Sequence, residues 1–469
     1  MFSRGVRSIA QCLITVSLLS GMLAGSSGCG SLPRIVPDMS THAAAPVQLE
    51  DGRGPLTATQ SKAILSRLES RGEATSIFDR HLALEESVAG SPLMVGNKVV
   101  LLQDGPVAFQ HMFDAIHNAR STINMETYII EDDEVGKRFA DVLIEKQTQG
   151  VQVNFIYDSV GSINTSKAFF QRLSDSGVRV LEFNPINPLT AKSGWDVNQR
   201  DHRKLLIVDG KIAFLGGINI NSVYSGGSFS RKSRQRPGGG LPWRDTQIQV
   251  EGPVVGDYQK LFLATWEKQK GTPLAAREYL PQLGNKGREV VRAIASTSDE
   301  PYSLIYVTLL SAINSAETSI NLTNAYFAPD AQLLAALKEA AGRGVDVRMI
   351  LPSKSDSWLV FNTGRSYYSE LLGAGVKIYE RRDALLHAKT ALIDGVWSTI
   401  GSTNLDWRSF LYNDEVNAVI LGPEFGAQMQ AMFDTDLASS NLITLEAWQH
   451  RSISERMKEA FARLWQRLL

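Results

Sequence analysis

The sequence contains an internal repeat, and the repeat limits the folds that the chain can adopt. Three segments recur in the same order: residues 115–125 match 312–322, residues 150–156 match 344–350, and residues 177–180 match 375–378. The offsets are 197, 194 and 198 residues, and each match reads as a helix end or glycine turn that runs into a strand. Because strand-like and helix-like segments alternate, we expect an α/β fold built from two duplicated units.

A fourth match carries the chemistry. The motif H-x-K-x4-D, followed by a glycine-rich turn and an asparagine, occurs twice: as His202, Lys204, Asp209 and Asn219, and as His387, Lys389, Asp394 and Asn404. The distance from histidine to asparagine is 17 residues in both copies. In an extended segment residues i and i+2 face the same side, so each histidine and its lysine point into one cleft.

These residue types suit a phosphodiester. Lysine supplies a positive charge and three donors for a phosphate oxygen, asparagine adds a neutral donor, and histidine can act as nucleophile or general acid. Lysine at the second motif position argues against metal ligation. A single H-x-K is common on surface strands, but a matched pair inside a repeat favours one site with in-line displacement through a covalent phosphohistidine.

The paired motif resembles the phospholipase D superfamily over roughly residues 95 to 440. The resemblance implies two α/β/α halves packed about a pseudo-twofold axis, with one shared active site and no metal or other cofactor. One of His202 and His387 would become the phosphohistidine and the other would protonate the leaving alkoxide; precedent favours His202 as nucleophile, but the sequence is symmetric. A carboxylate would orient each histidine, a role that Glu415 fits well and Asp245 less closely. Asp209 and Asp394, although part of the catalytic motif, are expected to be structural.

Segments around the motifs resemble bacterial cardiolipin synthases. They are Glu126-Thr127-Tyr128, the run from Gly401 to Ser409, and Asn413-Asp414-Glu415. The resemblance implies a transferase of phospholipid biosynthesis that moves a phosphatidyl group onto phosphatidylglycerol, with a second phosphatidylglycerol or phosphatidylethanolamine as donor. A phospholipase D that releases phosphatidic acid is the main alternative, because no motif distinguishes attack by an alcohol from attack by water.

Two further alternatives are disfavoured, one by the charge of the chain and the other by the intact motifs. With 48 Lys and Arg against 49 Asp and Glu, the chain lacks the basic excess of most nucleic-acid binders, so a nuclease of the same superfamily is disfavoured and no nucleic-acid partner is expected. A tethered scaffold with an inactive site is disfavoured by the intact duplicate motifs. Nothing in the sequence indicates the oligomeric state.

The N-terminus is typical of an export signal. Arg4 and Arg7 precede a short apolar run, and small residues then lead to Cys29. We expect residues 1–29 to be a signal peptide of the lipoprotein type with Cys29 as the lipidation site; ordinary cleavage or an uncleaved anchor are the alternatives. All three predict that the body is exported, and we expect a membrane-anchored protein of the bacterial cell envelope that resembles a peripheral class of cardiolipin synthases. Cys12 and Cys29 are the only cysteines, which excludes a disulfide framework and a thiol nucleophile from the rest of the chain.

The remaining boundaries follow composition. We expect a tether at 30–58, a helical lead-in at 59–94, the two halves at 95–280 and 281–440, and an amphipathic helix at 441–469. The stretch 222–242 carries Arg231, Lys232, Arg234 and Arg236, and is either a basic lid over anionic headgroups or a solvated loop. The C-terminal helix has Met457, Phe461, Leu464, Trp465, Leu468 and Leu469 at helical spacing among basic residues. It would lie in a membrane interface or, slightly favoured, dock on its own domain.

Overall fold

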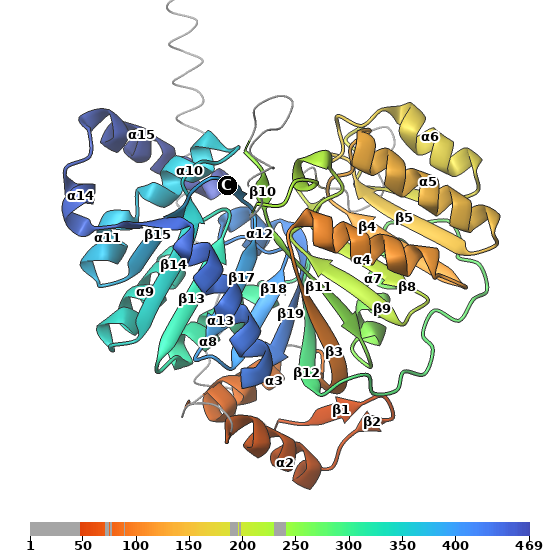
Figure 1. The fold of residues 1–469 in the computed structure, drawn as a ribbon, viewed down its shortest axis with the longest axis horizontal. Helices are drawn as coiled ribbons and strands as arrows, with labels where there is room; N and C mark the ends of the chain where they lie inside the picture. Colours follow the sequence, from red (N-terminus) through yellow and green to blue (C-terminus); the bar gives the residue numbers. More distant parts are fainter. Residues whose placement is uncertain are drawn as a thin grey trace, which may run out of the picture. The chain divides into compact units, whose positions relative to one another are not determined.

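The computed structural model describes residues 47–70, 75, 77–88, 90–187, 196, 198–228 and 241–469, which lie in one compact unit, Met39–Leu469 (Figure 1). The expected signal with Cys29 and the four basic residues of the 222–242 stretch lie outside the described residues. No helix in the described ranges is long and apolar enough to cross a membrane.

The duplicated fold is confirmed by two sheets with the same strand order. The first half has β6 (Arg179–Phe183), β5 (Gln152–Asp158), β4 (Thr122–Thr127), β8 (Lys204–Val208), β9 (Ile212–Gly216), β11 (Thr246–Glu251) and β3 (Leu93–Gln103). The second half has β15 (Lys377–Arg381), β14 (Asp346–Pro352), β13 (Ser319–Asn324), β17 (Lys389–Ile393), β18 (Trp397–Gly401), β19 (Asn413–Leu421) and β12 (Glu289–Ser296). In each half the first three strands are parallel and the others antiparallel. β3 pairs with β12, so the two sheets join edge to edge.

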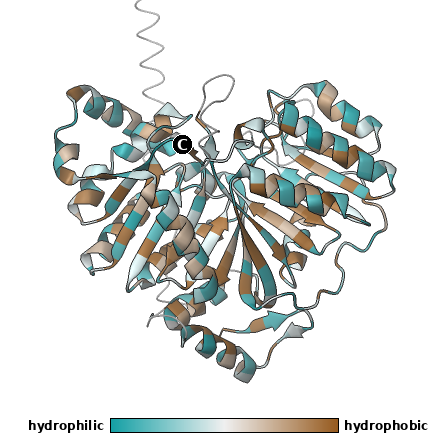
Figure 2. Ribbon diagram, in the orientation of Figure 1, coloured by the Kyte–Doolittle hydropathy of each residue, from teal (hydrophilic) through white to brown (hydrophobic). Residues whose placement is uncertain are grey.

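Helices cover both faces of each sheet. In the first half they are α4 (Gly105–His117), α5 (Glu134–Thr148), α6 (Lys167–Asp175) and α7 (Val255–Lys268); in the second they are α8 (Leu304–Ser315), α9 (Ala331–Gly342), α10 (Trp358–Arg365), α11 (Tyr368–Gly373), α12 (Trp407–Leu411) and α13 (Pro423–Ala438). Along β8, Leu206 packs in a core with α4, α5 and α6, whereas Leu205 packs in a second core with α7 and α13. Apolar residues accordingly dominate the strands (Figure 2), because successive side chains alternate between the two cores.

The region before the first half is more structured than expected. Within the range expected to be a tether, β1 (Leu49–Asp51) and β2 (Gly54–Pro55) form a small antiparallel pair, and β1 also pairs in parallel with β3. A flexible tether therefore does not extend to residue 58, because backbone pairing holds residues 49–55 on the sheet. The expected helices follow as α2 (Ala58–Glu69), the π-helix η2 (Ile77–His81) and α3 (Leu82–Val88).

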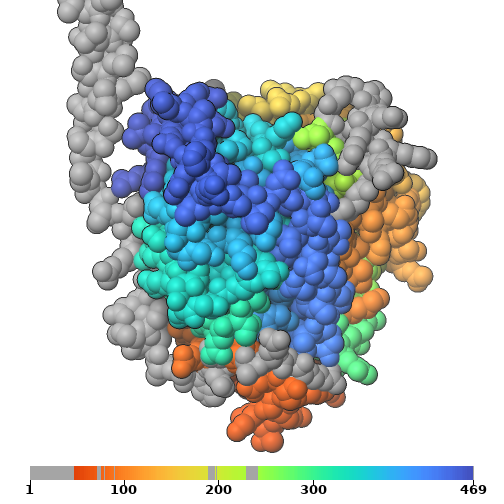
Figure 3. Space-filling model, turned by 60° about the vertical axis from the view of Figure 1, so that its left-hand side comes forward, coloured from red at the N-terminus to blue at the C-terminus, as the bar shows by residue number. Residues whose placement is uncertain are grey.

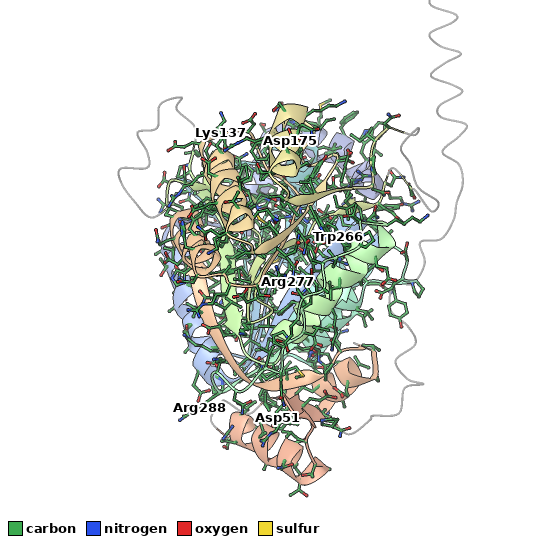
Figure 4. All side chains as sticks on the ribbon, turned by 90° about the vertical axis from the view of Figure 1, so that its right-hand side faces the viewer. Asp51, Lys137, Asp175, Trp266, Arg277 and Arg288 are labelled. Carbon is green, nitrogen blue, oxygen red and sulfur yellow. The ribbon has the colours of Figure 1, made fainter. Side chains whose placement is uncertain are left out.

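The two remaining segments connect and end the halves. Residues 269–288 run along the outside from Trp266 past Arg277 to Arg288, toward the end of the molecule that holds Asp51 (Figure 4). The C-terminal region is not one helix from residue 441: β20 (Ser440–Ile443) pairs with β15, and α14 (Leu445–Gln449), α15 (Ile453–Arg463) and the 3-10 helix η6 (Gln466–Leu468) follow. Thr444 is the N-cap of α14 and accepts from the Ala447 amide, and the capping box of Ser452 with Glu455 begins α15.

Candidate active site

Two short parallel pairings bring the halves together at the motifs. β7 (Arg200–Asp201), directly before His202, pairs with the first two residues of β19. In the same way β16 (Leu385–Leu386), directly before His387, pairs with β10 (Trp243–Arg244). In both pairings the residue that follows the paired segment of the other half is a carboxylate, so each motif histidine lies beside an acid of the other half.

The carboxylates cross between the halves. Glu415 Oε1 and Oε2 lie 3.0 and 3.1 Å from His202 Nδ1, and Asp245 Oδ2 lies 2.7 Å from His387 Nδ1. Both carboxylates are fully buried. A carboxylate that accepts from Nδ1–H fixes the ring and its tautomer and leaves Nε2 for chemistry. Sequence reasoning identified both acids as histidine partners, but it did not indicate that each serves the other half's histidine.

The two acids are held differently. Glu415 also accepts hydrogen bonds from Asn413 Nδ2, at 3.1 Å, and from the Ser402 hydroxyl. The position matching Ser402 is Gly217, where an added Cβ would lie 2.1 Å from Asp245 Oδ1. The shorter aspartate thus needs the space that a glycine leaves, whereas the longer glutamate is held by a serine hydroxyl.

Lysine and tyrosine complete each half of the site. Lys204 and Lys389 are buried, and each Nζ donates to the backbone carbonyl of its own motif histidine. The Tyr128 ring meets His202 edge-on at 4.9 Å, with Lys204 Nζ 5.2 Å from its centre. Tyr326 lies 6.2 Å from His387 and 6.0 Å from Lys389 Nζ. The sequence did not indicate Tyr326, because it is displaced by one residue from the register of the repeat.

His387 has two aromatic neighbours that have no counterpart at His202 among the described residues. The Tyr224 hydroxyl lies 3.1 Å from His387 Nδ1, and the Trp243 ring centre lies 5.1 Å from the His387 ring. Asn219, expected to bind phosphate, donates to the Tyr224 hydroxyl at 3.4 Å and accepts from the Ile129 amide at 3.2 Å. The turn that carries Tyr224, η4 (Ser222–Tyr224), begins the stretch that the sequence flagged only for its charges.

A match to a family model shows which protein family the chain belongs to. The model described as "Cardiolipin synthase, PLD-like domain" matches residues 112–225 and 309–437, one segment in each half. The chain belongs to this cardiolipin synthase family. It is 38% identical over 391 residues to a cardiolipin synthase of Geobacillus sp. (strain WCH70), covering 83% of this chain and 76% of that one. It is 38% identical over 371 residues to cardiolipin synthase 2 of Bacillus anthracis, covering 78% and 70%.

A solved structure shares the fold. Phosphatidylserine synthase of Haemophilus influenzae Rd KW20 superposes with a TM-score of 0.59 at 13% identity, over 87% of this chain and 100% of that one. At this identity the likeness concerns the fold alone, and it agrees with the two-sheet architecture.

Burial sets the protonation of this cardiolipin synthase-family site. Burial lowers the pKa of His202 to about 4, against the opposing effect of Glu415. Burial likewise lowers the pKa of Lys204 to about 7 and lowers those of His387 and Lys389. For Glu415, burial acts to raise the pKa, but His202, Lys204 and Ser402 outweigh it and bring the pKa to about 2. Near neutral pH, His202 is therefore neutral and Glu415 is ionised, and the ammonium group of Lys204 is partly deprotonated.

The motif aspartates lie at the far ends of their strands. Asp209 accepts the backbone amides of Arg120, Ser121 and Thr122, and Asp394 accepts those of residues 317–319. Each follows a strand whose first residue is the motif lysine, so its carboxylate points away from the histidines' end. This geometry agrees with the structural role expected of them: both cap the chain where a helix passes into β4 or β13. Asn404 lies near the histidines' end, and its Oδ1 is buried without a hydrogen-bond partner among the described residues.

Proposed function

We propose that this chain is a phosphatidyltransferase that makes cardiolipin from two molecules of phosphatidylglycerol, with His202 as nucleophile and His387 as general acid and base. The carrying observation is the crossed pair His202–Glu415 and His387–Asp245, which makes one two-histidine site from both halves. Membership of the cardiolipin synthase family gives the reaction class and a phospholipid substrate.

The first step forms a phosphohistidine. Nε2 of neutral His202 attacks the phosphorus of phosphatidylglycerol while the bond to the terminal glycerol oxygen breaks. The bound anionic phosphodiester favours the protonated form of His387, which burial alone disfavours. This form gives its Nε2 proton to the glycerol oxygen, so glycerol leaves neutral and His387 becomes neutral. We assign the nucleophile to His202, as the resemblance to the phospholipase D superfamily implies, and Glu415 beside it stabilises the imidazole as it becomes cationic.

The second step transfers the phosphatidyl group. Neutral His387 takes the proton from a hydroxyl of a second phosphatidylglycerol, whose oxygen attacks phosphorus as the bond to His202 breaks. Cardiolipin leaves, His202 returns to its neutral form, and His387 is protonated again. The ammonium groups of Lys204 and Lys389, with the Asn219 and Asn404 amides, stabilise the charge on the phosphate oxygens, because each lysine lies beside its motif histidine.

The same chemistry accepts a second donor and sets a location. With phosphatidylethanolamine as donor, ethanolamine replaces glycerol as the leaving group. The reaction needs diacyl lipids, and the signal-like N-terminus with Cys29 is consistent with an envelope protein anchored at a membrane surface. We include export, anchoring through Cys29 and membrane association in the proposal.

Lipid product analysis of the purified chain tests the proposal. Wild type is incubated with phosphatidylglycerol, with and without phosphatidylethanolamine, beside His202→Ala. We expect cardiolipin and glycerol from wild type and none from the variant; a higher yield with added phosphatidylethanolamine would identify it as a donor. Phosphatidic acid as the sole product would mean that water attacks the intermediate and would replace the transferase proposal with a hydrolase.

A further inference from the structure

An apolar surface remains uncovered at one end of the described unit. We define the α15 face as Ile453, Met457, Phe461, Leu464, Trp465 and, from α10, Trp358. These side chains are 46 to 78% exposed, and they account for half of the large apolar side chains that are exposed in the described part of the chain. Scattered single apolar residues are normal on a surface, but six gathered on one helix and its neighbour mark an interaction site.

The helix is docked, and the face points outward. Glu459 and Ala462 are its buried residues; Glu459 pairs with Arg451, and the backbone of Ala462 accepts from the Thr363 hydroxyl of α10. Ile453, Met457, Phe461 and Trp465 recur every fourth residue, so they form a stripe along a different side of the helix. In Figure 3 the dark blue C-terminal residues lie on the outside, next to the cyan residues of α10. One side of the helix therefore docks on its own domain, and the other side remains exposed.

Charge identifies the partner as an anionic lipid surface. Arg456, Lys458 and Arg463 are exposed within α15 and flank the apolar stripe. Arg463 also pairs with Glu370 at 3.3 Å, and Arg456 donates to the Gln449 carbonyl. Its two acids are engaged, Glu459 with Arg451 and Glu455 in the capping box with Ser452. An amphipathic helix with aromatic and aliphatic residues between flanking cations is suited to the boundary between acyl chains and anionic headgroups. Twofold pairing of this face with itself would instead bring cations against cations.

The face adjoins the active site. The backbone carbonyl of Leu469 accepts from the Arg408 amide at 2.7 Å. Arg408 follows the motif residue Asn404 by four positions. On its other side, Asp356 accepts from the hydroxyl of Tyr326, the ring beside His387, and Trp358 follows two residues later. Figure 1 shows α10 and α15 at the same end as β10 and α12. In the first half, exposed Ile163 lies on a loop whose Ser162 hydroxyl donates to the Tyr128 carbonyl.

We propose that the α15 face inserts into the headgroup region of a membrane containing phosphatidylglycerol and so presents the histidine site to its lipid substrates. This inference rests on the proposed function for the substrate, but not for the docking itself. The described unit would then draw lipids directly from the bilayer surface beside Tyr326 and Tyr128.

A position-specific probe tests docking. Vesicle binding alone does not isolate the face, because the apolar run at residues 9–23 has its own affinity for lipid. In the full chain with Cys12 and Cys29 replaced by serine, Met457→Cys carries a polarity-sensitive fluorophore. The control is Leu280→Cys, another exposed apolar position, in the connecting segment (47% exposed, against 67% for Met457). We expect a blue shift and quenching by brominated lipid for the first probe with phosphatidylglycerol–phosphatidylcholine vesicles, a smaller effect with phosphatidylcholine alone, and no change at the control.

The outcomes that overturn docking are specific. A probe at residue 457 that keeps its aqueous spectrum on both vesicles would rule out insertion. A blue shift without lipid that grows with protein concentration would identify a second copy as the occupant.

Activity separates docking from catalysis. We expect Met457→Glu with Phe461→Glu to lower cardiolipin synthesis on vesicles about tenfold, because two apolar anchors are lost. The same variant should retain the wild-type rate on short-chain phosphatidylglycerol dissolved as monomers, and Leu280→Glu should match wild type on both. Equal losses on both substrates would contradict the docking role. A wild type inactive on both would overturn the proposed function and leave the fluorescence result to decide docking.

Discussion

Glu415 lies in the second half of the chain, yet both of its carboxylate oxygens lie within 3.1 Å of Nδ1 of His202 in the first half. An ionised partner stabilises the cationic phosphohistidine, and an amide would not. We expect Glu415→Gln to lower kcat about 100-fold or more, while the thermal midpoint changes little because the side chain keeps its shape. Steady-state kinetics and calorimetry check this. An unchanged kcat would show that His202 needs no charged partner.

The crossed arrangement predicts one site rather than two. Replacing either His202 or His387 with alanine should abolish turnover, since each histidine does one half of every cycle. Residual activity near half in each variant would contradict a shared site.

The roles of the two histidines can be separated by trapping. If His202 is the nucleophile, His387→Ala should still form a phosphatidyl adduct on His202 slowly from substrates with a good leaving group, and His202→Ala should form none. Rapid quenching followed by mass spectrometry of the peptides locates the adduct. An adduct on His387 in the His202 variant would reverse the assignment.

Gly217 is required by the acid beside it. A methyl group there would lie 2.1 Å from Asp245 Oδ1, so Gly217→Ala must push the carboxylate away from His387. We expect activity to fall about tenfold or more and the free energy of unfolding to fall by about 1–3 kcal/mol. Ser402→Ala is the matched variant in the other half: it removes one hydrogen bond to Glu415 and should cost only about 1 kcal/mol. Activity measurements and denaturant titrations compare the two; equal effects would contradict the asymmetry.

The sequence predicted the strands and helices of each half, but not that each half supplies the carboxylate for the histidine of the other. The repeat, the motif strands and the helix-to-strand junctions at residues 115–125 and 312–322 all follow from local periodicity, which one chain segment carries by itself. The exchange of Glu415 and Asp245 depends instead on β7 pairing with β19 and β10 with β16, contacts between residues about 140 to 210 positions apart. Each of these pairings involves only two residues of the short strand, and so leaves no period in the sequence.

The lysines give the site a pH dependence with a defined sign. Burial lowers the pKa of Lys204 to about 7, so the free site holds its phosphate-binding charge below that pH and loses it above. We expect kcat/KM to fall above about pH 7 and, because His202 with its pKa of about 4 becomes protonated, to fall again in acid. Lys204→Arg should lower the rate but extend the plateau to higher pH, since a guanidinium stays charged. A pH profile with the same alkaline limb in the variant would exclude Lys204 as its source.

The motif aspartates should act on stability and not on chemistry. Asp394 accepts three backbone amides and the hydroxyls of Thr318 and Thr75, and it adopts a positive φ of 48°. Asp209 accepts three amides at the matching junction, and no threonine hydroxyl in the described part of the chain donates to it. Alanine leaves these amide donors, most of them part-buried, without their acceptor, so we expect both variants to be destabilised by about 1–3 kcal/mol, Asp394→Ala more than Asp209→Ala.

Turnover per folded molecule is the readout that separates these roles. Denaturant titration gives the loss of stability, and a burst assay that counts active sites gives kcat for the molecules that remain folded. We expect kcat within about twofold of wild type for both aspartate variants, because neither carboxylate reaches a histidine. If kcat per folded molecule fell as much as is expected for Glu415→Gln, Asp209 and Asp394 would have a catalytic role.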